Sequence, residues 1–396
     1  MRFIYTLICV VLFGTSFAQE QPTRIDRALA LYDRYEYANA IPLLLTIVEK
    51  DNGKNIEYME KLAMSYAKVK DFAQAEQWFS KIVNHSDHKP EHVFFYGQAL
   101  KSVGKYELAK EQFNKYSKTS SPTLNYVNEI KGIDSALVWK NTENRFQVEN
   151  VKNINSNLSD FSPFLLRDSV FFISERENEG DKNTYGWTGR PFLKVYKSSV
   201  NADFSLNGPE LSASSINSFG THIGPIASPD NGKTIYVSIT YPGKSVTVEK
   251  VNGTKYVTQR LGLFTYTLND GIYSEPVPFP YNDMEKYSLS HPAFSLDGQT
   301  LYFASDMPGG FGGSDIWYSE KQADGTWGNP VNAGSLINSS GDELFPTINA
   351  DGHLYYSSDG LPGLGGLDIF QAVGSKKSWT QVQNMGFVIN SSADDF

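Results

Sequence analysis

One segment of this sequence recurs four times, and this repeat limits the possible folds more than any other feature. Its clearest copy begins at Ile337-Asn338-Ser339, reaches a proline nine residues after the isoleucine, and passes through Asp351-Gly352 into Leu354-Tyr355-Tyr356-Ser357-Ser358. The repeated prolines are 62, 67 and 54 residues apart: Pro163, Pro225, Pro292 and Pro346. A period of this size indicates a repeat architecture.

Each copy has the composition of a β-hairpin. Asp-Gly between two short apolar runs is typical of a tight turn, because glycine adopts positive φ without steric cost. The runs on either side are rich in Phe, Tyr, Ile and Val, which favour strands. Two copies, from Ile154 and Ile216, share the Ile-Asn-Ser start, whereas the copy around Pro292 lacks it.

A second pair of matching segments adds two more strands to the unit. The glycine-rich run from Pro308 to Trp317 is repeated from Pro362 to Phe370, with the double glycine and the Asp-Ile-aromatic each displaced by 53 residues. Each run predicts a loop that enters a third strand, and Trp327 and Trp379 are predicted to begin a fourth. Repeated units of four antiparallel strands are typical of β-propeller blades. We therefore predict blades that start at Ile154, Ile216, Asp283 and Ile337.

The two ends of the propeller region predict an incomplete ring. Residues Phe146 to Val151 begin with alternating apolar and polar residues and occupy the place of a fourth strand, with no preceding three. The last segment, Ile389 to Phe396, repeats Ile337 to Leu344. We therefore expect the chain to stop within a fifth blade, so that Phe146 to Val151 is an unpaired strand of an open ring.

The region before the propeller has a different period. Aromatic residues at Tyr37, Phe72 and Tyr106 are 35 and 34 residues apart, and two further columns keep these offsets: Ala40, Ala75 and Ala109, and Leu44, Phe79 and Phe113. A helix-turn-helix unit of 34 residues resembles the tetratricopeptide repeat. The first of three repeats is degenerate, because Arg27 stands where the second has Leu62. The competing interpretation is a plain helical bundle.

A terminal helix and a partner surface complete this interpretation. Residues Leu124 to Trp139 predict a capping helix with an apolar face of Ile130, Ile133, Leu137 and Val138. Helical repeats of this kind present a concave surface to a peptide or helix. The candidate partner-binding positions on it are Glu57, Glu60, Phe94, Gln98 and Lys101. For Glu57 and Glu60, a merely solvated charge is the competing interpretation.

The N-terminus predicts export. Arg2 is followed by an apolar run and by Ser16-Phe17-Ala18, the pattern of a signal-peptidase site. We therefore divide the chain into a signal peptide (1–18), a helical domain (19–140) and a propeller (141–396). The only cysteine, Cys9, lies in the signal peptide, which excludes thiol chemistry from the mature chain. A net charge of −9 argues against nucleic acid as a partner.

The motifs that suggest chemistry have simpler explanations. The glycine-rich loops lead into strands, so they offer no helix N-terminus to a phosphate. Asp306 and Asp315, with Asp359 and Asp368, provide too few oxygens for calcium, which favours turn-forming aspartates. His88 and His92 have the spacing of a helical metal pair, but Pro90 is expected to open the helix between them. We predict no catalytic, cofactor-binding or metal-binding residue.

The propeller motifs also carry a family resemblance. The run His291-Pro292-Ala293-Phe294-Ser295, followed by Asp297-Gly298 and Leu301 to Asp306, resembles the WD40-like repeat that is also called PD40. The run from Pro308 to Trp317 resembles the version in envelope proteins of Bacteroidetes, where it follows a signal peptide and tetratricopeptide repeats. The whole of residues 19–396 is similar in architecture to PorE-type proteins associated with type IX secretion and gliding.

This resemblance implies a location and a function. PorE-type proteins continue into a carboxypeptidase-regulatory-like domain and an OmpA-like domain that binds peptidoglycan, and both are absent from this chain. The resemblance therefore implies a non-enzymatic periplasmic scaffold at the outer membrane, with PorP/SprF-type membrane proteins or secretion components as partners. Peptidoglycan would be bound only through the absent domains.

Two other functions compete with the scaffold. A TolB-like propeller would bind a peptide or glycan in its central channel. A propeller enzyme, such as a lyase or peptidase, would need clustered acid–base residues, which the sequence does not show, and the hydrolase signature Gly-x-Ser-x-Gly does not occur. The fold class expected is thus α+β: a helical solenoid followed by an all-β propeller of at least four blades.

Overall fold

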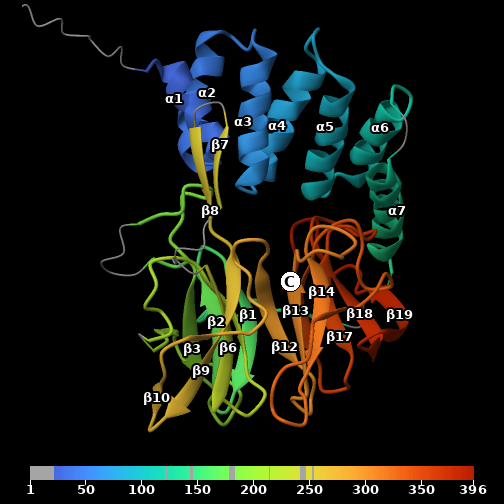
Figure 1. Cartoon of the computed structure of the whole chain (residues 1–396). Coiled ribbons are helices and arrows are strands. Elements are labelled where there is room, and N and C mark those ends of the chain that lie inside the picture. Colours follow the sequence, from blue (N-terminus) through green and yellow to red (C-terminus); the bar gives the residue numbers. More distant parts are fainter. Residues whose placement is uncertain are drawn as a thin grey trace, which may run out of the picture.

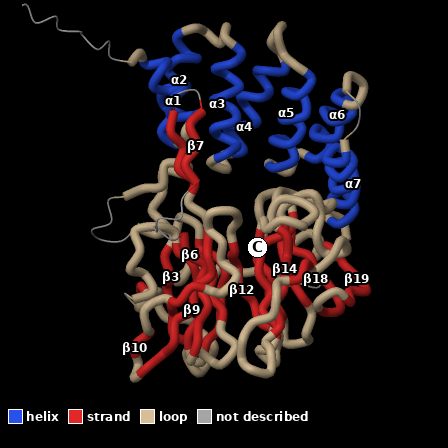
Figure 2. Tube along the Cα trace, viewed as in Figure 1, coloured by secondary structure: helices blue, strands red, loops and turns tan. Residues whose placement is uncertain are grey.

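The chain folds into a layer of helices that stands on a β-propeller (Figures 1 and 2). The computed structural model describes residues 22–120, 123–142, 146–177, 183–213, 215–240, 247–251 and 254–396. The predicted signal peptide and Cys9 lie outside these residues. The predicted fold class, helices followed by a propeller, is confirmed.

Helices of the first layer are joined by short turns. The described residues form α1 Arg24–Asp33, α2 Tyr37–Lys50, α3 Ile56–Lys68, α4 Phe72–Val83, α5 Pro90–Ser102, α6 Tyr106–Tyr116 and α7 Leu124–Trp139. Side chains of Asn55, Asp71 and Thr123 accept backbone N–H groups at the starts of α3, α4 and α7. Such caps stabilise a helix because the first turn has no internal acceptors.

Residues of the three predicted columns lie in the core of this layer, except Phe72, which is half-buried. Tyr37, Phe72 and Tyr106 are the first residues of α2, α4 and α6. The alanine column is fully buried, and Leu44, Phe79 and Phe113 are at most 1% exposed. Gly97 of α5 allows a close helix crossing, because a Cβ there would lie 2.8 Å from the Phe113 ring. The layer is therefore repeat-like, as the period predicts.

The structure agrees with most of what the sequence predicts for the cap helix and for the pair His88 and His92. Helix α7 spans the predicted residues and buries Ile133, but Val138 is 64% exposed, so its assignment to the apolar face is wrong. Helix α5 begins at Pro90 and leaves His88 outside. His92 is buried: its Nδ1 accepts the Lys89 N–H, so Nε2 is the donor to Glu60 of α3 at 3.2 Å.

The described strands form four blades of antiparallel sheet. Blade 1 contains β1 Asp160–Leu166, β2 Ser169–Ser174, β3 Lys194–Ser199 and β4 Glu210–Leu211. Blade 2 contains β5 Ile223–Ala227, β6 Thr234–Thr240, β9 Leu261–Asn269, β10 Ile272–Tyr273 and β11 Val277–Pro278. Blade 3 contains β12 Leu289–Phe294, β13 Thr300–Ser305, β14 Asp315–Glu320 and β15 Val331–Asn332. Blade 4 contains β16 Glu343–Ile348, β17 Leu354–Ser358, β18 Asp368–Ser375 and β19 Ser378–Asn384.

A separate hairpin departs from blade 2. Strands β7 Thr247–Val251 and β8 Thr254–Thr258 pair with each other between β6 and β9, and extend toward the helical layer (Figure 1). In the other blades the predicted hairpins and third strands are confirmed. Trp379 lies in β19, whereas Trp327 forms an isolated bridge with Lys321 ahead of β15.

The repeated prolines mark a β-bulge in the innermost strand of each blade. The register shifts between Phe161 and Phe164 in β1, and at the corresponding places in β5, β12 and β16. The residue before the proline has left-handed φ in three blades: 53° at Ser162, 51° at His291 and 52° at Phe345. Such φ values are uncommon for non-glycine residues. The bulge therefore places a residue with a strained backbone in the innermost strand of each of these three blades.

An asparagine closes each blade, and three of these four asparagines belong to an Ile-Asn-Ser motif, whereas Asn282 stands in Tyr281-Asn282-Asp283. In each blade a carboxamide Oδ1 accepts a backbone N–H of the third strand at 2.8–3.0 Å, and its Nδ2 donates to the carbonyl of the same residue at 2.7–3.0 Å. The four asparagines and the residues they bind are Asn217 with Val195, Asn282 with Leu263, Asn338 with Ile316, and Asn390 with Ile369. We call this pair of bonds the asparagine clamp. Each clamp comes from the segment that follows the blade it closes.

The glycine-rich loops owe their glycines to tight packing. A Cβ at Gly312 would lie 2.3 Å from the carbonyl oxygen of Gly341, and one at Gly365 would lie 2.2 Å from that of Ala393. Asp315 accepts the N–H groups of Phe311 and Gly312, and Asp368 accepts those of Leu364 and Gly365. These two aspartates are fully buried and fold the loops, as expected of turn-forming residues.

We expect Asp368 to make stability depend on pH. Burial raises its pKa from 3.8 to about 6, against the opposing effect of the two N–H donors. Because the folded-state pKa is the higher one, the stability contributed by the protonated form is present below about pH 4 and is lost as pH rises through 6. Relative to wild type, Asp368→Asn should gain about 2 kcal/mol of unfolding free energy between pH 4 and pH 7.5.

Urea unfolding at several pH values measures this difference. The same change at the exposed Asp87 controls for the substitution itself. If the Asp368→Asn difference were constant over this range, Asp368 would titrate alike in the folded and unfolded states, and the prediction would be wrong.

Neighbouring blades share apolar cores, with one exception. Blades 1 and 2, 2 and 3, and 3 and 4 each contribute to a common buried cluster. Among the described residues, no such cluster joins blade 4 to blade 1. These two blades meet through the rings of Phe161, Phe345 and Phe396, whose centroids are 4.4–5.9 Å apart. We call the region between blades 4 and 1 the seam.

The segment predicted as an unpaired strand lies outside the sheets. Residues 146–151 form no strand, and Phe146, Val148 and Val151 are 44–62% exposed, so the prediction of a strand is wrong. The alternating pattern is present, but none of the described strands pairs with this segment. The segment Ile389 to Phe396 is ordered against blade 4: Asn390 clamps Ile369, and Asp395 donates its N–H to Leu367.

The helical layer rests on the propeller through specific contacts. Helix α7 meets the loop before β18 so closely that a Cβ on Gly132 would lie 2.4 Å from the Gly363 carbonyl oxygen. Leu364 of this loop is fully buried among side chains of α5, α6 and α7. On the other side, the Trp187 ring packs at 5.0 Å on Tyr37. The predicted domain boundary at 140/141 follows the end of α7, but the two parts share an interface.

Candidate binding cavity

A cavity lies at the interface between the two layers. Its volume is about 570 Å³, and its walls come from helices α3, α4, α5 and α7 and from the upper loops of blade 4. The helical wall includes Phe79, Phe95 and Gln98, and the propeller wall includes Leu361 and the glycines at 341, 360, 365 and 366. The cavity thus combines an apolar surface with exposed backbone, as ligand sites do.

A buried ion pair lies in the helical wall. The Lys101 ammonium is 2.7 Å from Glu129 Oε2, and the Gln98 amide donates to Glu129 Oε1 at 3.1 Å. These bonds connect α5 to α7 and hold all three side chains in fixed positions. Because both charges are largely removed from water, the pair depends on this geometry, and removal of one partner would leave the other uncompensated.

The propeller wall is acidic. Burial raises the pKa of Asp359, and the neighbouring Asp342 and Asp394 carboxylates add to the shift, whereas Lys70 opposes it. Lys70 itself reaches from the α3–α4 turn to Asp394 at 2.7 Å. The raised pKa shows that an ionised Asp359 is costly here, so a cationic or hydrogen-bond-donating group in the cavity would be favoured.

The edges of the cavity are fixed by two bonds across the layers. The Asn128 amide of α7 donates to the Gly360 carbonyl oxygen at 2.7 Å. At the opposite edge the Trp187 indole N–H donates to the Lys68 carbonyl oxygen at 2.9 Å. These contacts join the C-terminal half of the helical layer to blade 4, and its third helix to an insertion in blade 1.

The structure brings together two of the five predicted partner-binding residues. Gln98 and Lys101 line the cavity. Phe94 packs inside the helical layer against Phe113 and Tyr116, so it faces the core. Glu57 is exposed beside Lys61, and Glu60 pairs with His92; neither lines the cavity. For Glu57, this agrees with the alternative of a solvated charge.

Several residues of the cavity could not be found from the sequence. Glu129 lies in the predicted cap helix, but no pattern marks it as the partner of Lys101. Trp187 is a single aromatic residue in an irregular insertion of blade 1. Asp359 follows a recognised strand, yet its role depends on how the two layers dock. The only signal was the repeated Asp at the start of each glycine-rich loop.

A second cavity occupies the central channel. Its volume is about 340 Å³, and all four repeated prolines line it together with His291 and Phe345. The imidazole of His291 stacks on the Phe345 ring at 4.0 Å, and the His291 N–H donates to Ser238 of blade 2. Burial lowers the pKa of His291 to about 3, so the ring is neutral at physiological pH. The His291 side chain therefore adds no charge to the channel wall.

Among the described residues, no group of three or more His, Cys, Asp or Glu side chains is arranged to hold a metal ion. None of the described helices is long and apolar enough to cross a membrane.

The fold defines the class of this protein: a helical, repeat-like layer docked on a four-bladed β-propeller. No protein-family model and no curated relative matches the chain. Among solved structures it is similar to a puromycin hydrolase, with 12% identity and a TM-score of 0.32 over 57% of this chain and 39% of that one. The chain thus spans well under half of that protein.

Two further similarities are of the same kind. A structure from a study of two prolyl endopeptidases matches 56% of this chain and 29% of its own length, with 11% identity and a TM-score of 0.30. A putative 6-phosphogluconolactonase from Bacteroides uniformis matches 55% of this chain and 85% of its own length, with 11% identity and a TM-score of 0.25. These scores are too low to support an argument about function.

Proposed function

We propose that this protein is a non-enzymatic adaptor that docks a polypeptide segment in the cavity between its helical layer and its propeller. One observation carries the proposal: both repeat regions contribute to one cavity whose edges are fixed by bonds across the layers. The combination of aromatic side chains, carboxamides and exposed glycine backbone suits an extended peptide, which needs apolar contacts and hydrogen bonds together. The acidic propeller wall favours a segment with a basic residue.

The setting of this function rests on the sequence. The signal-peptide pattern and the resemblance to PorE-type proteins support a periplasmic location at the outer membrane, with PorP/SprF-type proteins or other secretion components as partners. A role in type IX secretion or gliding, and anchoring to peptidoglycan through a longer parent, belong to the same proposal.

Site-specific photo-crosslinking tests the proposal. A photoreactive residue at Asn125, which lines the cavity and is exposed, should give a discrete protein adduct in cells that express the protein. The same residue at Glu57, exposed on the helical layer but outside the cavity, is the matched control. Equal adducts at both positions, or none at Asn125, would contradict docking in the cavity.

Ligand binding in the central channel is a second candidate. The observation that favours it is the left-handed backbone of Ser162, His291 and Phe345, since strained residues often mark functional sites. Native mass spectrometry of the purified chain would then show a peptide or glycan, and His291→Ala would remove it.

A further inference from the structure

Two of the closed interfaces between blades are sealed by a tryptophan. Trp327 of blade 3 inserts toward blade 2, where its indole N–H donates to the Tyr236 hydroxyl at 3.0 Å and its ring lies 6.2 Å from that of Tyr236. Trp379 of blade 4 inserts toward blade 3, lies 6.4 Å from Tyr302 and donates to the Ala333 carbonyl oxygen. Each tryptophan therefore fills a slot beside a tyrosine of the second strand of the preceding blade.

The seam has the same tyrosine beside a different neighbour. Tyr355 occupies in β17 the position of Tyr236 and Tyr302, as the matching runs Ile235-Tyr236-Val237, Leu301-Tyr302-Phe303 and Leu354-Tyr355-Tyr356 show. No described tryptophan lines the space beside it. Instead a groove of about 330 Å³ lies there, bordered by Phe146, Ile369, Met385 and Phe396. Blade 4 thus presents a half-exposed apolar slot toward the seam.

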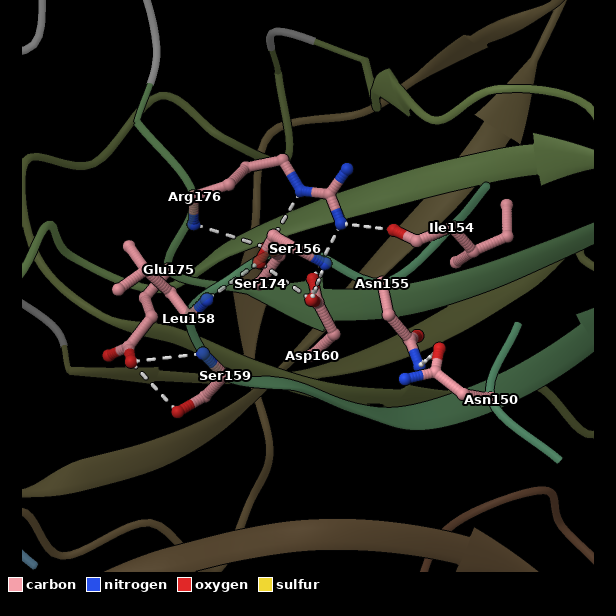
Figure 3. Close-up of polar contacts among 10 residues, drawn as sticks. All are labelled: Asn150, Ile154, Asn155, Ser156, Leu158, Ser159, Asp160, Ser174, Glu175 and Arg176. Carbon is pink, nitrogen blue, oxygen red and sulfur yellow. Dashed lines mark hydrogen bonds and ion pairs between the residues drawn. The ribbon is translucent and has the colours of Figure 1, made fainter. Parts of the chain in front are cut away.

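The opposite side of the seam holds an asparagine clamp that no described strand occupies. Asn155 is the first Ile-Asn-Ser asparagine, yet its amide donates to the Asn150 side chain and it is exposed (Figure 3). In the filled clamps the partner of the asparagine is a backbone N–H and C=O of a third strand. In the filled clamps of blades 3 and 4, Asn338 and Asn390 also donate to an asparagine six residues earlier, Asn332 and Asn384, whereas Asn150 lies five residues before Asn155. Asn155 therefore keeps its hydrogen bond to a neighbouring asparagine, but no described third strand binds to its side chain.

An arginine keeps this wall of the seam in place. Arg176 of blade 1 donates to Asp160 at 2.6 Å and to the Ile154 carbonyl oxygen at 2.7 Å (Figure 3). Its guanidinium also lies over the rings of Phe172 and Tyr196. The corresponding positions in blades 3 and 4 are Met307 and Gly360. The contact fixes the backbone beside Asn155, so the wall is preformed.

We infer that the seam between blades 4 and 1 is a docking site for a β-hairpin of a partner polypeptide that carries a tryptophan. The tryptophan inserts beside Tyr355, and the backbone of an adjacent strand occupies the Asn155 clamp. The chain makes the tryptophan contact twice and the asparagine clamp four times within its own ring, so the interfaces already present define the occupant. This site is separate from the cavity between the layers and does not depend on its function.

A peptide copy of the chain's own hairpin is the probe. A labelled synthetic peptide with residues 315–332, which form β14, β15 and Trp327, should bind the full chain saturably in fluorescence anisotropy. The same peptide with Trp327→Ala should bind at least tenfold more weakly, as removal of a central aromatic anchor usually does. In the protein, Asn155→Ala and Tyr355→Ala should each weaken binding at least tenfold, while Phe204→Ala, at a residue 87% exposed on blade 1, should not.

The outcomes separate the alternatives. Asn155 is exposed, so its alanine variant tests the site even if Tyr355→Ala fails to fold. No saturable binding, or equal binding of the two peptides, would overturn the inference. A concentration-dependent dimer of the chain that Tyr355→Ala abolishes would also overturn it, because the occupant would then be a second copy of this chain.

Discussion

Gly312→Ala is expected to destabilise the propeller by about 3 kcal/mol or more, the upper range for overpacking in a closed interior. The new Cβ would lie 2.3 Å from the Gly341 carbonyl oxygen and 2.6 Å from that of Ser339. Both are backbone atoms in the turn between blades 3 and 4, which cannot move aside as a flexible side chain can. Relief requires that one blade shift against the other.

Thermal and urea unfolding measure the effect. Gly208→Ala makes the same chemical change where no atom lies within 4 Å of the new Cβ, and it should alter the free energy of unfolding by less than about 0.5 kcal/mol. If the two variants had equal stability, close packing would not explain why glycine stands at position 312. Backbone flexibility would then be the reason.

These glycines show what the sequence alone could establish. The displacement of 53 residues predicted a repeated loop and the strand after it, because turns and strand propensity are local properties. The reason for each glycine is not local: Gly312 touches residues about 30 positions away, in the next repeat. The same limit applies to Gly132, whose helix would accept alanine but whose contact with Gly363 would not.

The sequence predictions that were wrong or incomplete have a common cause. Phe146 to Val151 alternates like a strand, yet a strand forms only where a neighbour offers its N–H and C=O groups, and periodicity does not report that neighbour. The candidate residues Gln98 and Lys101 were found because an inward-facing helix position is a property of the repeat. Glu129 and Trp187 were missed because they meet the cavity only through docking of the two layers. The sequence therefore predicts each layer better than the space between them.

The asparagine clamp leads to the second large effect. Asn338→Ala is expected to destabilise the chain by about 3 kcal/mol, because it removes both bonds to Ile316 and leaves a buried backbone N–H without an acceptor. The Ile316 carbonyl oxygen would keep its bond from the Ala333 N–H, so most of the cost arises at the orphaned donor.

Asn155→Ala is the matched control. Asn155 belongs to the same motif, but it is exposed and no described strand occupies its clamp, so its removal should cost less than about 0.5 kcal/mol. Equilibrium unfolding of both variants decides the matter. Equal losses would mean that the asparagine acts in its own turn, and that closure of the preceding blade comes from apolar packing alone.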